Sequence, residues 1–492
     1  YHLSNNPLFQ PPRIVNLTPF WTRPFLNLYV PLTYSAWMLI GLGAHTATPD
    51  PSGIYLNPTV FHVVNLIAHA TCTLLVYWIV RRLTARNWAA CAGALLFALH
   101  PLQVETVAWV SSFRDLLATA LALASISFYL DAHPDRRGEC RDARYIASLA
   151  AFALATLSKP SVIVVPPILL VIDRLVLRRS ARGTVPFFVL AIPCMIWTKL
   201  LQRAPDVPPI ALWQRPIVAL DAIGFYLMKL IAPLNLTIDY SRTPARVLAD
   251  RSTWIPCIVA GAVIAALIII ARRRPVLLCA LAIFLLGLAP VLGFVPFDYQ
   301  AKSTVADRYV YLPMLGIALA FAIVAAHLPR LGAACIVVVL CVLAALTMVR
   351  TLAWRDSLTL FHAAERVNPD SWAVQNNLAA MELDTNPASA EARARRVIAL
   401  NPNFMWGPLH LGAALAMQNR IPDAIEVLTG AIRRWPKSAE AHAALAAALL
   451  DGGYDSVALE EYDLAVELSP GDRTIRALRD RVFRKLHPST AP

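Results

Sequence analysis

The chain has 492 residues, of which 58% are hydrophobic and only 15% are charged, and its formal net charge is +13. Soluble domains carry about 25% charged residues, so this composition excludes an ordinary soluble protein. Many apolar runs are long enough to cross a hydrocarbon core of ~30 Å, which predicts a polytopic membrane protein. The eight cysteines form no Cys-x-x-Cys pair and are expected to be apolar packing residues.

Apolar segments follow one another through most of the first 350 residues. Two of them, 25–43 and 215–233, contain polar residues such as Tyr34 and Lys229 and are compatible with a helix lying in the membrane interface. The other segments are candidate membrane spans: 58–81, 88–100, 113–131, 144–158, 160–177, 184–200, 253–271, 276–294, 309–328 and 332–349.

Arginine-rich loops indicate which segments cross the membrane. Such clusters follow the first, third, fifth and seventh spans: Arg81, Arg82 and Arg86; Arg136, Arg137, Arg141 and Arg144; Arg178, Arg179 and Arg182; and Arg272 to Arg274. Short loops rich in Arg face the cytoplasm. All four share that side only if 25–43 and 215–233 do not cross, so we expect both to lie on or dip into the outer face. The alternative, two further spans, places the Arg-rich loops outside.

The same topology predicts the domain boundaries. Residues 1–57 become an exterior first loop with an interfacial helix at 25–43, residues 58–350 a membrane domain, and 351–370 a connecting segment. A further span is then expected before Tyr1, giving eleven spans in the intact protein. The C-terminal part emerges on the outer side.

The sequence after residue 370 is repetitive. Asn-Pro-Asp at 368–370, Asn-Pro-Asn at 401–403, Trp-Pro-Lys at 435–437 and Ser-Pro-Gly at 469–471 recur with spacings of 33, 34 and 34 residues. This period predicts tetratricopeptide (TPR) units at about 371–404, 405–438 and 439–472, with a capping helix at 473–487. The sequence therefore predicts an all-α protein, in which a membrane bundle of about ten spans precedes an α-solenoid. Residues 371–492 carry 13 Arg and Lys against 14 Asp and Glu, so no nucleic-acid partner is expected.

Polar side chains interrupt the apolar segments, and at membrane depth such groups mark functional sites. On the outer side they come from five separated regions: His62, Asn65 and His69; His100, Glu105, Arg114 and Asp115; Lys159; Asp239 and Tyr240; and Asp307, Arg308 and Tyr309. Structural alternatives exist, since Asp115 suits a helix cap, Glu105 can pair with Arg114, and Lys159 and Arg308 can extend to headgroups. His62 and His69 can be packed, hydrogen-bonded residues. We favour one shared cavity, because a bundle gathers such groups away from lipid.

Transfer from a lipid-linked phosphate fits these residues. Arg308, Lys159 or Arg114 would bind the phosphate and stabilise the leaving group. Glu105 would take the proton of an acceptor hydroxyl or, with His100, orient the substrates. The remaining polar residues would contact substrates: Asp115, Asp239, Tyr240, Asp307, Tyr309, His62, Asn65 and His69. Because no His/Asp cluster has clear ligand spacing, no cofactor is expected, and the need for a metal stays open.

Four motifs together resemble one family. They are His-Pro-Leu-Gln-Val-Glu-Thr-Val-Ala-Trp-Val (100–110), Phe-His-x-x-Asn-x-x-x-His (61–69), Leu-Ser-Lys-Pro (157–160) and Ala-Asp-Arg-Tyr-Val-Tyr-Leu-Pro (306–313). With the repeats that follow, they resemble the multi-spanning, TPR-bearing glycosyltransferases of the GT-C fold, whose eukaryotic members are O-mannosyltransferases of the endoplasmic reticulum. The resemblance implies a dolichyl- or polyprenyl-phosphate sugar donor, inverting transfer, and an active site and repeats on the outer or lumenal face.

The sequence departs from that family in three places. The family's acidic pair, expected just after its first span, would lie upstream of Tyr1, and the main catalytic base with it. Val30 precedes Pro31-Leu32-Thr33 where relatives usually have a basic residue or His. Ser-Phe-Arg-Asp at 112–115 replaces a more highly charged run. Glu105 is then the best carboxylate left.

Two other functions are compatible with the sequence. A membrane-anchored TPR scaffold could recruit envelope proteins without catalysis, although it would not need charged groups in five loops. A transporter should show repeats among its spans, and none is apparent. We therefore expect a hexosyltransferase that moves mannose or a related hexose to a protein or glycan hydroxyl, with a polypeptide in the TPR groove. It would lie in a bacterial inner membrane with periplasmic repeats, or in the endoplasmic reticulum with lumenal ones.

Overall fold

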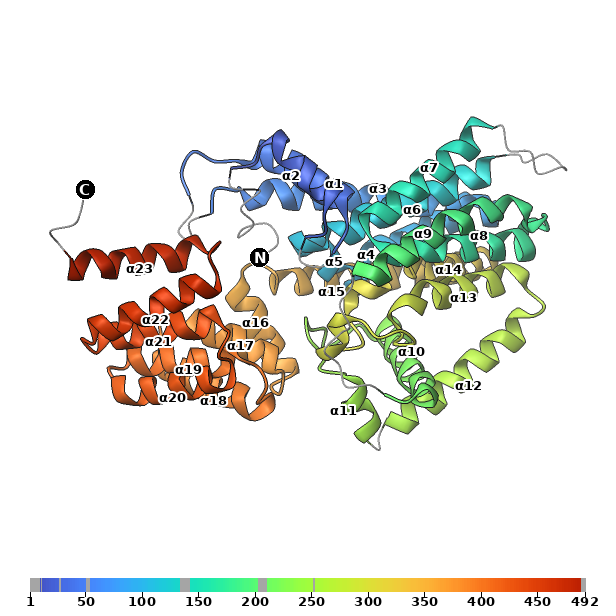
Figure 1. Ribbon diagram of the computed structural model, residues 1–492. Helices are drawn as coiled ribbons and strands as arrows, with labels where there is room; N and C mark the ends of the chain where they lie inside the picture. Colours follow the sequence, from blue (N-terminus) through green and yellow to red (C-terminus); the bar gives the residue numbers. More distant parts are fainter. Residues whose placement is uncertain are drawn as a thin grey trace. The chain divides into compact units, whose positions relative to one another are not determined.

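The computed structural model describes residues 9, 11–25, 28–49, 54–132, 142–201, 210–250 and 253–487. Over these residues the secondary structure is helical, and the only β-type pairing consists of isolated bridges. The chain forms two compact units, Tyr1–Trp354 and Arg355–Pro492, which run from blue to pale orange and from orange to red in Figure 1. The predicted all-α class is therefore confirmed. Arg136, Arg137 and Arg141, used in the topology argument, lie outside the described residues.

The first unit is a helix bundle. Its helices are α1 (Thr18–Thr22), α2 (Pro31–Ala44), α3 (Pro58–Thr84), α4 (Asn87–Leu99), α5 (Val104–Ala108), α6 (Phe113–Asp131), α7 (Ala143–Ser158), α8 (Val165–Ile172), α9 (Val185–Leu201), α10 (Arg215–Ile231), α11 (Pro244–Ala249), α12 (Trp254–Ala271), α13 (Pro275–Leu288), α14 (Met314–His327) and α15 (Arg330–Leu352). Short 3-10 turns join several of them, among them η2 (Pro101–Gln103), η3 (Val110–Ser112), η4 (Pro160–Val164), η9 (Ala289–Val291) and η11 (Asp307–Val310).

Each of the ten predicted span segments contains an apolar helix. Among the described residues, five stretches are long and apolar enough to cross a membrane: Pro58–Thr84, Val110–Asp131, Pro160–Leu177, Ala181–Leu201 and Gly332–Leu352. A sixth, Asn87–Leu99 with Pro101–Ala108, qualifies only as a pair bent by 51°. Shorter apolar helices cover the other four segments: Ala143–Ser158, Trp254–Ile270, Pro275–Val291 and Met314–His327. The protein is thus a membrane protein, and within its described residues five helices, or six with the bent pair, are long and apolar enough to cross.

Arginine-bearing helix ends gather at one end of this bundle, which we call the arginine end. Arg82, in the last turn of α3, pairs with Asp131 at the end of α6 at 2.5 Å. Arg144, at the start of α7, donates to the Asp131 carbonyl at 3.3 Å. Arg86 donates to the Ala326 carbonyl near the end of α14 at 2.9 Å. Grouping of these ends agrees with the shared side expected of the Arg-rich loops.

Helix α2 keeps both of its termini at the other end of the bundle. In its first turn, Thr33 Oγ1 donates to the carbonyl of Ser158, the last residue of α7, at 2.9 Å. At its last residue, the Ala44 carbonyl accepts from the N–H of Asn57, the cap of α3, at 2.8 Å. This geometry supports a helix that does not cross the membrane.

Helix α10 also has both of its termini at the end of the bundle opposite the arginine end. At its start, Arg215 donates to the Phe294 carbonyl just after η9 at 2.7 Å. Near its end, the Leu230 carbonyl lies 3.2 Å from His100 Nε2. Like α2, it is absent from the helices long and apolar enough to span.

The second unit is a stack of antiparallel helix pairs (Figure 1). Its helices are α16 (Ser357–Val367), α17 (Trp372–Glu382), α18 (Pro387–Leu400), α19 (Trp406–Met417), α20 (Ile421–Arg434), α21 (Ala439–Asp451), α22 (Asp455–Leu468) and α23 (Arg473–Leu486). Small residues let the paired helices approach, as where Gly412 of α19 faces the Leu428 side chain of α20. Helix pairs with a 34-residue period confirm the predicted TPR fold. The segment expected to be a connection contributes α16 to this unit.

Candidate active site

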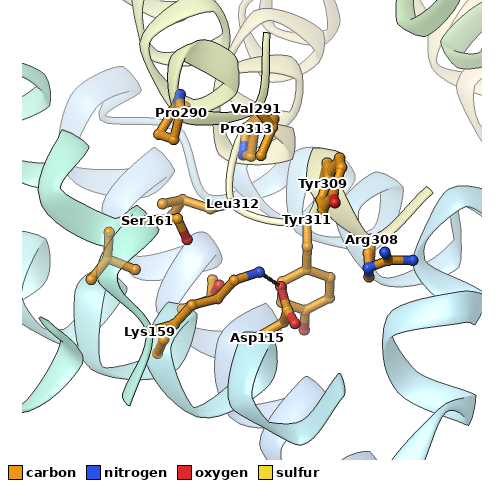
Figure 2. Close-up of a pocket in the computed structure, with 14 residues that line it drawn as sticks. Asp115, Lys159, Ser161, Pro290, Val291, Arg308, Tyr309, Tyr311, Leu312 and Pro313 are labelled. Atoms are coloured by element: carbon orange, nitrogen blue, oxygen red, sulfur yellow. Dashed lines mark hydrogen bonds and ion pairs between the residues drawn. The ribbon is translucent and has the colours of Figure 1, made fainter. Parts of the chain in front are cut away.

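Residues from four separated parts of the membrane unit meet around one cavity (Figure 2). The cavity is partly open, and the empty space within it and its open mouth together is about 410 Å³. Four of the predicted site residues line it: Asp115, Lys159, Arg308 and Tyr309. The rest of the lining is mostly apolar and comes from α6, η4, α13, η9 and the turn before α14: Ala118, Thr119, Ser161, Val162, Gly287, Pro290, Val291, Tyr311, Leu312 and Pro313.

Lys159 reaches the cavity because α7 ends one residue before it. Pro160 follows and disfavours helical backbone at Lys159, which is extended instead. Its Nζ donates to Asp115 Oδ1, as Figure 2 shows. Arg114 Nε lies 3.7 Å from Asp115 Oδ2, so two cations flank this carboxylate. Asp115 lies in the first turn of α6, whose N-cap residue Ser112 makes no side-chain capping bond. Of its two ion-pair contacts, the one with Lys159 is the shorter.

Arg308 and Glu105 form a buried ion pair next to the cavity. Arg308 Nη1 donates to Glu105 Oε1, and the two side chains are only 4% and 0% exposed. The guanidinium carbon lies 4.2, 4.9 and 5.2 Å from the ring centres of Tyr299, Tyr309 and Trp109, which are cation–π distances. Glu105 thus pairs with Arg308, not with Arg114, and Arg308 does not extend to a headgroup. Glu105 Oε2 has no hydrogen-bond partner among the described residues.

Asp307 and Tyr240 form a hydrogen-bonded pair and do not line the cavity. The Tyr240 hydroxyl donates to Asp307 Oδ1 at 2.6 Å. Burial, together with the negative charge of Glu105, raises the pKa of Asp307 to about 7. Asp239 accepts hydrogen bonds from the Ser241 N–H at 2.8 Å and hydroxyl at 3.3 Å, which shape the loop that carries Tyr240.

The three polar residues of α3 have different surroundings. Asn65 is buried and donates to the carbonyls of Val107 at 2.9 Å and Trp109 at 3.3 Å. His69 Nε2 faces the Ala98 carbonyl at 3.2 Å and must donate to it, so Nδ1 accepts from the Tyr311 hydroxyl at 2.8 Å. His62 is exposed and does not line the cavity. Asn65 and His69 therefore fix neighbouring segments.

His100 fixes the bend between α4 and α5. Its Nδ1 accepts from the Leu102 N–H at 3.3 Å, which caps η2, and its Nε2 donates to the Leu230 carbonyl at 3.2 Å. Pro101 cannot continue α4 because it lacks an N–H. The result is the 51° bend, which turns Glu105 toward Arg308.

Several residues around the site are not among the predicted site residues. Tyr299 stacks on Arg308, and Tyr311 bonds His69. Arg242 binds Asp221 of α10 through two nitrogens, with Nε at 3.0 Å from Oδ2. Tyr311 belongs to the motif at 306–313, and Asp221 and Arg242 are opposite charges in or near an apolar segment, so the sequence offers a signal for these three residues but none for Tyr299. The described residues contain no group of three or more His, Cys, Asp or Glu arranged to hold a metal ion.

Comparison with known proteins points to one class, the membrane mannosyltransferases. Residues 57–197 match the family model for dolichyl-phosphate-mannose-protein mannosyltransferase. Protein O-mannosyl-transferase F38B6.6 of Caenorhabditis elegans is 24% identical over 371 residues, 70% of this chain and 51% of that protein. TMTC3 of Mus musculus is 24% identical over 428 residues, 75% and 45% of the two chains. Tmtc2 of Drosophila melanogaster is 41% identical over 73 residues, 15% and 8%.

These similarities confirm the resemblance that the motifs predicted. The matched family model covers α3 to α9, where Asp115, Lys159 and Glu105 lie. The chain is similar to two of these protein O-mannosyl-transferases over most of its own length, and it spans about half the length of each.

Proposed function

We propose that this protein is a glycosyltransferase that moves a hexose, such as mannose, from a polyprenyl or dolichyl phosphate to a hydroxyl of a protein or glycan. One observation carries the proposal: the cavity lining combines two basic side chains and the carboxylate of Asp115 with mostly apolar residues. Lys159 and Arg308 line it together with Val162, Val291 and Pro313. A polyprenyl phosphate has two matching parts, since its anionic phosphate suits the basic side chains and its apolar chain suits the apolar ones. The names of the relatives agree with this substrate class.

In the proposed reaction, the bond between the sugar C1 and the phosphate oxygen breaks, and a bond from C1 to the acceptor oxygen forms. The lipid phosphate leaves with its negative charge, which Lys159 and Arg308 stabilise with Arg114 nearby. The acceptor proton goes to a carboxylate. Within this chain Glu105 is the proposed base, through the Oε2 that Arg308 leaves unbound. His100 holds the Glu105 segment in place.

The other site residues take supporting roles in this proposal. Asp115 directs the Lys159 ammonium into the cavity, and Tyr309 stacks on Arg308. Asp239, Tyr240 and Asp307 support the acceptor side from outside the cavity lining, and Asn65 and His69 hold the segments of the donor side. His62, which is exposed and does not line the cavity, takes no part in the proposed reaction. The TPR unit binds the polypeptide acceptor in its groove. The active site and the repeats would face the periplasm or the lumen of the endoplasmic reticulum.

The test is label transfer by the full chain in nanodiscs, supplied with radiolabelled polyprenyl-phosphate mannose and membrane-protein acceptors. Lys159→Met should lower transfer by about 10²-fold or more, because one stabiliser of the leaving charge is lost. Lys199→Met is the matched control, since Lys199 is an exposed lysine in the last turn of α9, and it should keep full activity. Absence of transfer by the unaltered protein with every sugar donor would support the scaffold alternative.

A further inference from the structure

We propose that Trp109, together with the Glu105 and Arg308 side chains beside it, binds the hexose ring of the donor. The inference rests on the proposed function and names a sugar subsite beside that cavity, because Arg308 lines the cavity whereas Trp109 and Glu105 do not. It gives a role to an exposed aromatic residue that neither the phosphate contacts nor the packing of the bundle requires.

Trp109 is exposed in a segment that is otherwise buried. Residues 100–106 are all buried, whereas Trp109 is 39% exposed. The backbone holds it there: its N–H donates to the Glu105 carbonyl at 3.1 Å, and its carbonyl accepts from Asn65 at 3.3 Å. Backbone hydrogen bonds therefore hold this position of the chain, and the large apolar indole that it carries stays partly uncovered by protein.

The ring lies next to the proposed phosphate site. Arg308 is 5.2 Å from the Trp109 ring centre and 4.9 Å from that of Tyr309, which lines the cavity. One guanidinium thus touches both the cavity and Trp109. A sugar attached to a phosphate bound at Arg308 has its ring within reach of the indole.

Unsatisfied polar atoms lie in the two turns that lead to Trp109. Both amide atoms of Gln103, Glu105 Oε2 and Thr106 Oγ1 are buried without a hydrogen-bond partner among the described residues. Buried polar groups are nearly always paired in folded proteins, so such a group calls for a ligand or water. A hexose offers an apolar ring face for the indole and hydroxyls that both donate and accept. Aromatic, carboxylate and amide groups placed together suit that ligand.

Aromatic anchoring in the membrane interface is the competing explanation, since tryptophans concentrate there. Trp213 and Trp254 are more exposed, at 70% and 54%, and fit that explanation. Trp109 differs because it contacts a buried ion pair. Trp254→Ala therefore serves as the matched control.

The test compares the binding of two lipids to the full chain in nanodiscs: polyprenyl-phosphate mannose and bare polyprenyl phosphate. Trp109→Ala should weaken binding of the mannosylated lipid by roughly 10-fold, the size expected for one stacked aromatic contact, and should leave the bare lipid unaffected. Trp109→Phe should keep most of the affinity. Lys159→Met should weaken both lipids, and Trp254→Ala neither.

Several results would overturn the proposal. These are equal weakening of both lipids by Trp109→Ala, no weakening of either, or weakening by Trp254→Ala to the same degree. If the unaltered protein binds neither lipid, the proposed function itself fails, which is a different outcome from a selective failure of Trp109→Ala.

Discussion

The two ends of the membrane bundle contain the same kinds of charged residues in opposite surroundings. At the arginine end, Arg82 and Asp131 pair with side chains that are 53% and 28% exposed. At the cavity end, Arg308 and Glu105 pair with side chains that are 4% and 0% exposed. An exposed pair contributes little to stability, whereas a buried pair bears a large desolvation cost. Charge alone therefore does not distinguish the two ends of the bundle, whereas burial and unsatisfied polar atoms do.

The largest expected effect comes from removing one charge of the buried pair. Arg308→Gln leaves Glu105 buried without its counter-charge, which should lower stability by about 3–5 kcal/mol and abolish transfer. Thermal unfolding in nanodiscs, followed with the transfer assay, measures both. Arg82→Gln is the control from the arginine end and should change stability by less than about 1 kcal/mol. Similar losses in the two variants would remove the distinction between the ends.

The double variant Glu105→Gln with Arg308→Met sharpens that prediction. It removes both buried charges, so stability should recover relative to Arg308→Gln, while transfer stays absent. Restored transfer would show that neither residue takes part in the reaction.

Next in size is a pH effect centred on Asp307. Because its folded pKa is raised to about 7, the folded protein holds this proton more tightly than the unfolded chain does. Stability from this group is complete below about pH 4 and is lost as the pH rises toward 7, after which it changes no further. Asp307→Asn should remove this decrease from the thermal midpoints measured between pH 4 and 8.

Tyr240→Phe provides the matched variant for the Asp307 prediction. The Tyr240 hydroxyl lowers the Asp307 pKa by donating to its carboxylate. Its loss should therefore move the decrease in stability to higher pH. An unchanged profile in both variants would assign the pH dependence to other groups.

A smaller effect is expected at Asn65. Asn65→Ala leaves the Val107 and Trp109 carbonyls without this donor, which should cost about 1–3 kcal/mol of stability. Thr71→Ala on the same helix is the control, because the Thr71 hydroxyl is exposed and bonds its own helix backbone at Ile67. If Asn65→Ala and Thr71→Ala lower the stability equally, the hydrogen bonds from Asn65 to the carbonyls of Val107 and Trp109 contribute nothing to it.

The helical segments, the repeats and the two ends of the bundle can be predicted from local sequence. Apolar runs locate the ten helical segments, and the 34-residue period locates the repeats. The arginine clusters predict which helix ends lie at the arginine end of the bundle, and they place 25–43 and 215–233 at the opposite, cavity end. The contacts of Thr33 and Leu230 agree with that placement. These features follow from composition and spacing, which act over short distances along the chain.

The ion pairs inside the site could not be predicted from local sequence. Glu105 and Arg308 are 203 residues apart, and their meeting depends on a helix bend and on the packing of several helices. The convergence of Lys159, Asp115 and Arg308 was expected from the cost of charge in lipid, but the partners were not. The stacking of Tyr299 on Arg308 and the exposure of Trp109 likewise arise from tertiary packing, which no periodicity reports.

The most direct measurement is an experimental structure of the full chain in nanodiscs with polyprenyl-phosphate mannose bound. We expect the lipid phosphate within hydrogen-bond reach of Lys159 Nζ and the Arg308 guanidinium, with the polyprenyl chain against Val162, Val291 and Pro313. Phosphate bound at the arginine end, or a cavity that stays empty at saturating lipid, would contradict it.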